Sequence, residues 1–74
     1  MPKGYAALIA EWKEADAAAK EAEDTLRDAY EAHFAQRGPA PTAEQRQAVA
    51  ALRAASQEKL KAALAYLDRV KKPA

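Results

Sequence analysis

Glycine and proline are confined to the two ends of this 74-residue chain and to one short segment in its middle. That segment reads Arg37-Gly38-Pro39-Ala40-Pro41-Thr42 and separates two long stretches that contain no helix breaker. Proline cannot continue a helix, and glycine readily takes the left-handed conformation that closes one, so we expect Gly38 to end the first helix. The sequence therefore predicts helices at about 5–37 and 43–71, joined by a turn at 38–42.

The second helix has a clear start. The run Thr42-Ala43-Glu44-Gln45 fits the capping box. In that motif the Thr42 hydroxyl accepts a hydrogen bond from the Gln45 amide, and the Gln45 side chain accepts one from the Thr42 amide. We therefore expect the second helix to begin directly after Thr42.

The first helix carries a heptad repeat. Trp12, Ala19 and Leu26 each open a heptad and are each followed by a base, an acid and an alanine. The resulting seam is bulky at its ends and alanine-rich in its middle, and consists of Tyr5, Leu8, Trp12, Ala15, Ala19, Ala22, Leu26, Ala29 and His33. Ion pairs four residues apart, Asp16 with Lys20 and Glu23 with Arg27, are expected to support this helix. The pattern is typical of a coiled coil.

The second helix has an apolar stripe that can pack on this seam. Its members recur at steps of three and four: Val49, Leu52, Ser56, Leu60, Ala63, Leu67 and Val70. Antiparallel pairing around a turn near Pro39 should bring together residues whose numbers sum to about 79, such as Trp12 and Leu67. Residues 1–37 carry five basic and eight acidic side chains and residues 38–74 seven and three, so the two halves attract. The chain is thus expected to be one all-α domain over residues 1–74, an antiparallel two-helix coiled-coil hairpin.

Such a hairpin would have little core of its own. The chain has 22 alanines, 14 larger apolar side chains apart from Met1, and no cysteine. Domains of this size usually need a disulfide, a metal or a partner. The second helix has a second apolar strip, and further apolar residues lie at the edge of the seam on the first helix. Together they form a candidate self-association or partner face: Ala48, Ala51, Ala55, Ala62 and Tyr66 from the second helix, and Ile9, Tyr30 and Phe34 from the first. Either alanine serves here only as a good helix former, or two hairpins dimerise into a four-helix bundle, which we expect.

Residues suited to catalysis or metal binding are few. The candidate nucleophiles and base are Ser56, Thr25, Thr42 and His33, and the antiparallel register separates Ser56 from His33 by about three turns. Tyr30 stands where the Glu-x-x-His motif of di-iron bundles would need a glutamate. We therefore expect no enzymatic activity, no metal and no cofactor.

A basic edge on the second helix offers an alternative function. Arg46 and Arg53 lie along one edge, and Lys61 lies further round, so this edge could contact phosphates. Gln57 and Asp68 interrupt the edge, and the net charge of the chain is only +1. Solvated charge beside a seam is the simpler interpretation, and nucleic acid is not the expected partner.

The sequence as a whole favours a non-enzymatic protein–protein interaction module, such as a small adaptor, a chaperone-like accessory or an assembly subunit. Its expected partners are a second copy of itself and another protein, for which Tyr5 and Trp12 are candidate anchors. The alternative is a small regulatory protein that contacts nucleic acid. No apolar run approaches the length that spans a bilayer. The first apolar run, Tyr5 to Ala10, is interrupted by Glu11 and does not fit a secretory signal. We therefore expect a cytoplasmic protein without membrane contact.

Overall fold

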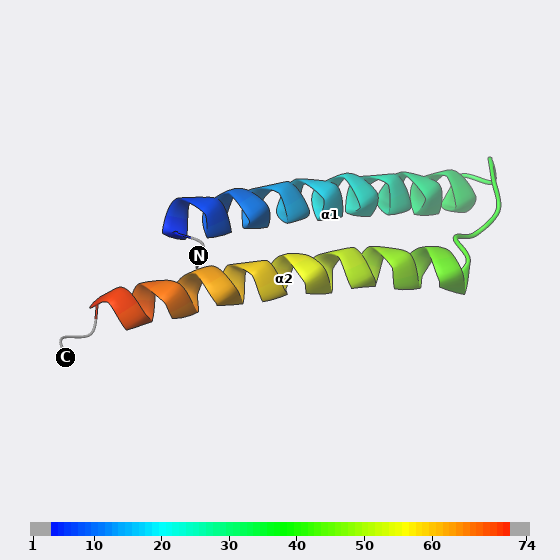
Figure 1. Cartoon of the computed structure of the whole chain (residues 1–74). Helices are drawn as coiled ribbons and strands as arrows, with labels where there is room; N and C mark the ends of the chain where they lie inside the picture. Colours follow the sequence, from blue (N-terminus) through cyan, green and yellow to red (C-terminus); the bar gives the residue numbers. More distant parts are fainter. Residues whose placement is uncertain (1–3, 72–74) are drawn as a thin grey trace.

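The computed structural model describes residues 4–71, with Lys71 described by its backbone alone. It contains two helices, α1 (Tyr5–Phe34) and α2 (Ala43–Lys71), which run antiparallel side by side (Figure 1). The hairpin is a narrow rod of 60 × 19 × 17 Å. Its loop end holds the connection between the helices, and its open end holds the start of α1 and the end of α2, which extends past that start (Figure 1). The predicted all-α hairpin is confirmed.

The start of α2 is fixed by the predicted capping box. The Thr42 amide donates to Gln45 Oε1 at 2.7 Å, and the Gln45 amide donates to Thr42 Oγ1 at 3.1 Å. Two backbone donors that the helix itself leaves unpaired are thereby satisfied. Glu44 in the first turn adds a favourable interaction with the helix dipole.

The end of α1 differs from the prediction. The helix ends at Phe34, and the residue in the left-handed conformation is Gln36, with φ of 61°; no glycine of the described residues has positive φ. The Arg37 amide donates to Ala32 O at 2.8 Å and the Gln36 amide to His33 O at 2.9 Å, which together form a Schellman motif. The prediction for Gly38 is wrong because Gly38 precedes Pro39, and a residue before proline favours extended backbone.

The register also differs from the prediction. Tyr5 stacks on Tyr66 with 6.4 Å between ring centroids, and Lys59 Nζ lies 3.0 Å from Glu11 Oε1. In the predicted register the numbers of facing residues sum to about 79, which would have placed Asp68 opposite Glu11. Because α1 ends early, residues 35–42 form a longer connection than the predicted turn, and the helices can slide by about one to two turns. The predicted register is therefore wrong.

The contact between the helices buries small side chains. Ala19, Ser56 and Ala63 are the buried helical residues, and no apolar side chain larger than alanine is buried among the described helical residues. Leu52 and Val70, both predicted in the apolar stripe, remain 39% and 63% exposed. Small residues let the two helices approach closely, but the isolated hairpin gains little hydrophobic stabilisation from them.

Candidate interaction surfaces

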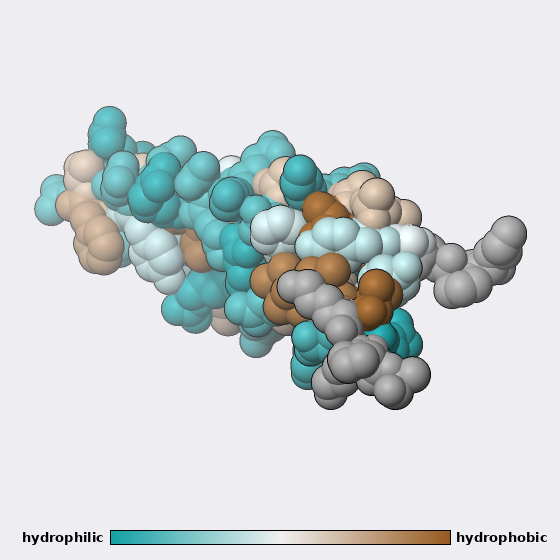
Figure 2. All heavy atoms as spheres, turned by 90° about the vertical axis from the view of Figure 1, so that its left-hand side faces the viewer, coloured by the Kyte–Doolittle hydropathy of each residue, from teal (hydrophilic) through white to brown (hydrophobic). Residues whose placement is uncertain are grey.

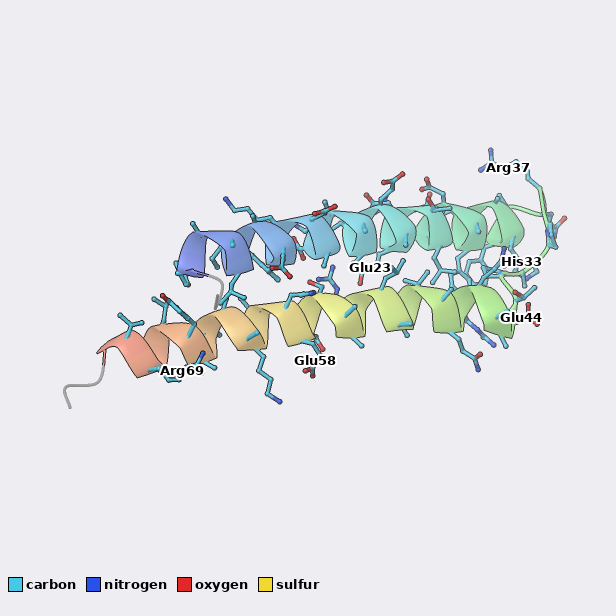
Figure 3. The ribbon with its side chains drawn as sticks, viewed as in Figure 1. Glu23, His33, Arg37, Glu44, Glu58 and Arg69 are labelled. Atoms are coloured by element: carbon cyan, nitrogen blue, oxygen red, sulfur yellow. The ribbon has the colours of Figure 1, made fainter. Side chains whose placement is uncertain are left out.

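A cluster of charged side chains crosses the seam near the middle of the hairpin. Arg53 of α2 donates through Nε and Nη2 to the two carboxylate oxygens of Glu23, at 3.0 and 2.7 Å. Its Nη1 donates to Asp16 Oδ1 at 2.8 Å and approaches Ser56 Oγ at 3.5 Å. Figure 3 shows Glu23 directed from α1 toward α2. We call these four residues the Arg53 cluster; it links the helices through bidentate, charge-assisted hydrogen bonds.

The Arg53 cluster is ionised near neutral pH. Hydrogen bonds from Arg53 hold the pKa of Asp16 and the pKa of Glu23 below their ordinary values, and the two carboxylates raise the pKa of Arg53 in turn. Lys20 Nζ lies 3.2 Å from Asp16 Oδ2, which confirms that predicted pair. The predicted pair of Glu23 with Arg27 is wrong, because Glu23 turns to the partly buried guanidinium of Arg53 instead.

The residues of the alternative nucleic-acid edge do not form one surface. Arg53 is engaged by two carboxylates within the hairpin. Arg46 and Lys61 are exposed, and neither makes an ion pair within residues 4–70. Only these two of the three predicted cations are thus free to meet a phosphate.

The opposite flank of the seam holds a shallow groove. Glu23 lies on the flank of the Arg53 cluster, which we call the Arg53 flank, and Tyr30 shares its seven-residue spacing. Ala22 and Ala29 each stand one position before these residues, and a rotation of about 100° per residue turns them to the other side of α1. The groove has a volume of about 410 Å³ and is lined by Ala18, Glu21, Ala22, Thr25, Leu26, Ala29, Gln45, Ala48 and Val49. We call this side of the hairpin the groove face.

Acidic side chains border the groove face along α1. Glu21 lines the groove, and Glu14 lines a smaller hollow beside it, with Glu11, Ala15, Ala18 and Lys59. Asp28 continues the same stripe at a spacing of seven residues and is exposed. We call Glu14, Glu21 and Asp28 the acidic rim. Sequence reasoning placed Ala22, Leu26 and Ala29 of the α1 wall in the seam and did not predict the groove.

The predicted self-association face is divided between the two flanks. Ala48 lines the groove, and Ala51, Ala55 and Ala62 are exposed along the same side of α2. Tyr66 is half-buried against Tyr5. The remaining predicted members, Ile9, Tyr30 and Phe34, lie on the Arg53 flank.

Ile9 and Tyr30 share the seven-residue spacing of Asp16 and Glu23, which places them on the Arg53 flank of α1. Tyr30 stacks on Phe34, with 6.2 Å between ring centroids, and Phe34 is 78% exposed. No single partner helix could therefore lie against all eight predicted residues.

The open end gathers large apolar side chains. Leu64 is 50% exposed there, and Val70 is also exposed. Tyr5 is at the limit of exposure, whereas Trp12 is half-buried, so Tyr5 is the more accessible of the two predicted anchors. Figure 2, which looks at the open end, shows hydrophobic atoms gathered at this end, whereas most of the remaining visible surface is hydrophilic.

Polar groups suited to catalysis are dispersed. Ser56 is 1% exposed and belongs to the Arg53 cluster, whereas His33 lies near the loop, with Nδ1 3.2 Å from Gly38 O (Figure 3). Within residues 4–71, no three His, Cys, Asp or Glu side chains are grouped so that they could hold a metal ion. In the same range, neither helix has an apolar stretch long enough to cross a membrane.

Comparison with protein-family models, curated proteins and solved structures finds no match to this chain.

Proposed function

We propose that this chain is a non-enzymatic protein–protein interaction module that works as a small adaptor, chaperone-like accessory or assembly subunit. In this proposal two hairpins associate into a four-helix bundle, which then presents its remaining surfaces to another protein. Association through one flank leaves the aromatic pair Tyr30 and Phe34, on the other flank, available for that second partner.

The observation that carries the proposal is the exposure of the larger apolar side chains. The hairpin buries Ala19 and Ala63, whereas Leu52, Leu64, Val70 and Phe34 remain in contact with solvent. Burying apolar surface contributes roughly 25 cal/mol per Å², so covering exposed apolar side chains with further helices is strongly favourable. Helix hairpins commonly meet this need by forming bundles around a shared core.

The groove offers a first test of this proposal. Ala48→Gln adds a long polar side chain to the groove wall, whereas the matched variant Ala54→Gln changes an exposed alanine of the same helix that does not line the groove. Overpacking a helix contact weakens it by about 1–3 kcal/mol, so we expect Ala48→Gln to raise the dimer dissociation constant at least about fivefold. Sedimentation equilibrium over a wide concentration range measures this constant for both variants and for the unchanged chain.

Two results would contradict the proposal. A helical species that has the mass of one chain at every concentration would exclude self-association. Salt-dependent binding of duplex DNA that is lost in a double variant, Arg46→Ala with Lys61→Ala, would favour a regulator that contacts nucleic acid instead.

A further inference from the structure

We infer that a second copy of this chain covers the groove, with α1 of each copy beside α2 of the other and both loops at the same end of the bundle. This inference rests on the self-association proposed above and adds its geometry.

Two hairpins that pack groove face against groove face have two symmetric arrangements. If the two-fold axis runs along the helices, α1 lies beside the second copy's α2, and the loops share one end. If the axis runs across the helices, α1 lies beside the second copy's α1, α2 lies beside its α2, and the loops lie at opposite ends. The two arrangements cover the same groove but bring different helices together.

The two helices carry opposite charge. α1 has three basic and eight acidic residues, a net charge of −5, whereas α2 has six basic and three acidic residues, a net charge of +3. The same-end arrangement alternates negative and positive helices around the bundle. The opposite-end arrangement sets two helices of charge −5 side by side, and like charges at a contact suppress association.

The acidic rim leads to the same choice at the level of residues. In the opposite-end arrangement, Glu14, Glu21 and Asp28 of one copy would lie along the same three residues of the other. In the same-end arrangement they lie along the flank of α2, whose seven-residue stripe is Ala48, Ala55, Ala62 and Arg69. This stripe has three small side chains and one cation, so it permits close approach. Together with Glu44 and Glu58 of the neighbouring stripe it carries a net charge of −1, against −3 for a second acidic rim.

Spin-label distances test the geometry directly. The chain has no native cysteine, so Ala40→Cys places one label in the loop and Ala65→Cys one label near the open end. We expect the two loop labels of a dimer to lie within about 30 Å of each other, roughly the width of two helix layers with their labels. Loop labels about 45 Å or more apart, the length of α1, would overturn the inference. The Ala65→Cys labels should likewise lie close together.

Charge reversal is an independent test because the two arrangements predict opposite signs. Glu21→Lys loses attraction to α2 in the same-end arrangement, and we expect the dimer dissociation constant to rise about threefold to tenfold. In the opposite-end arrangement the substitution would change the charge of each acidic rim from −3 to −1, so the repulsion between the two rims would fall and the dimer would tighten. Glu31→Lys, away from the groove, is the control of equal charge.

The outcomes separate this inference from the proposal on which it rests. A stable dimer with distant loop labels, or one that Glu21→Lys strengthens or leaves like the control, would overturn the same-end geometry alone. A chain that remains monomeric at every concentration would overturn self-association together with this geometry.

Discussion

At the scale of single residues, Arg53 determines how the two helices meet. Seam positions recur three or four residues apart, so either Leu52 or Arg53 could follow Val49 in the seam of α2. Hydropathy favours Leu52. The structure places Arg53 across the seam instead, because the carboxylates of Asp16 and Glu23 receive its guanidinium. A sequence pattern ranks side chains by hydropathy and does not reveal which distant carboxylates will meet a given arginine.

The Arg53 cluster predicts a pH dependence of stability. The pKa values of Asp16 and Glu23 are lowered from their ordinary values of 3.8 and 4.5 by hydrogen bonds from Arg53. Groups with a lowered pKa stabilise the fold above their ordinary pKa and lose that contribution as the pH falls through the folded-state value. We therefore expect the midpoint of urea unfolding to fall from pH 5 downward, and to fall less steeply in Arg53→Met.

A matched variant controls this prediction. Arg46→Met removes an exposed arginine of the same helix that makes no ion pair among the described residues, and it should keep the pH dependence of the unchanged chain. If Arg53→Met and Arg46→Met gave the same dependence, the Arg53 cluster would not be formed in solution.

Gln36 carries backbone strain that a single substitution can relieve. Its φ of 61° lies in the left-handed region, which glycine adopts without steric penalty. We expect Gln36→Gly to stabilise the hairpin by about 1 kcal/mol in chemical unfolding, with Gln57→Gly, in the middle of α2, destabilising by a similar amount. Destabilisation by Gln36→Gly would show that α1 does not close in this way.

At the scale of helices, local patterns sufficed to locate the elements. The capping box fixed the start of α2, and the segment rich in glycine and proline located the break, because both act through neighbouring residues. The end of α1 and the register escaped prediction. Both depend on where the chain leaves the helix before Pro39, and on contacts such as Glu11 with Lys59, which are far apart in sequence.

The capping box makes a quantitative prediction for α2. Thr42→Ala removes the acceptor of the Gln45 amide, and the loss of such a cap costs about 1 kcal/mol of stability. Thr42→Ser is the matched control, because it keeps a hydroxyl that can accept the hydrogen bond from the Gln45 amide. We expect urea unfolding to show a clear loss for Thr42→Ala and little loss for Thr42→Ser. Equal effects would contradict the capping role.

At the scale of the whole molecule, the hairpin is an incomplete domain. Its buried helix contact consists of alanine and serine, several of its larger apolar side chains face solvent, and its two flanks differ in character. Composition predicted this shortage of core. The division of the predicted partner face between two flanks was not predictable, because it follows from the rotation of α1 that the Arg53 cluster fixes.

The central claim is that these helices depend on a surface that one chain does not provide. The most direct test is the thermal midpoint of helix loss, followed by far-ultraviolet circular dichroism across a hundredfold or wider range of chain concentration. Because association stabilises the folded form by mass action, we predict that the midpoint rises steadily with concentration. A cooperative midpoint that stays constant over the whole range would mean that a single hairpin is stable alone, and would contradict the claim.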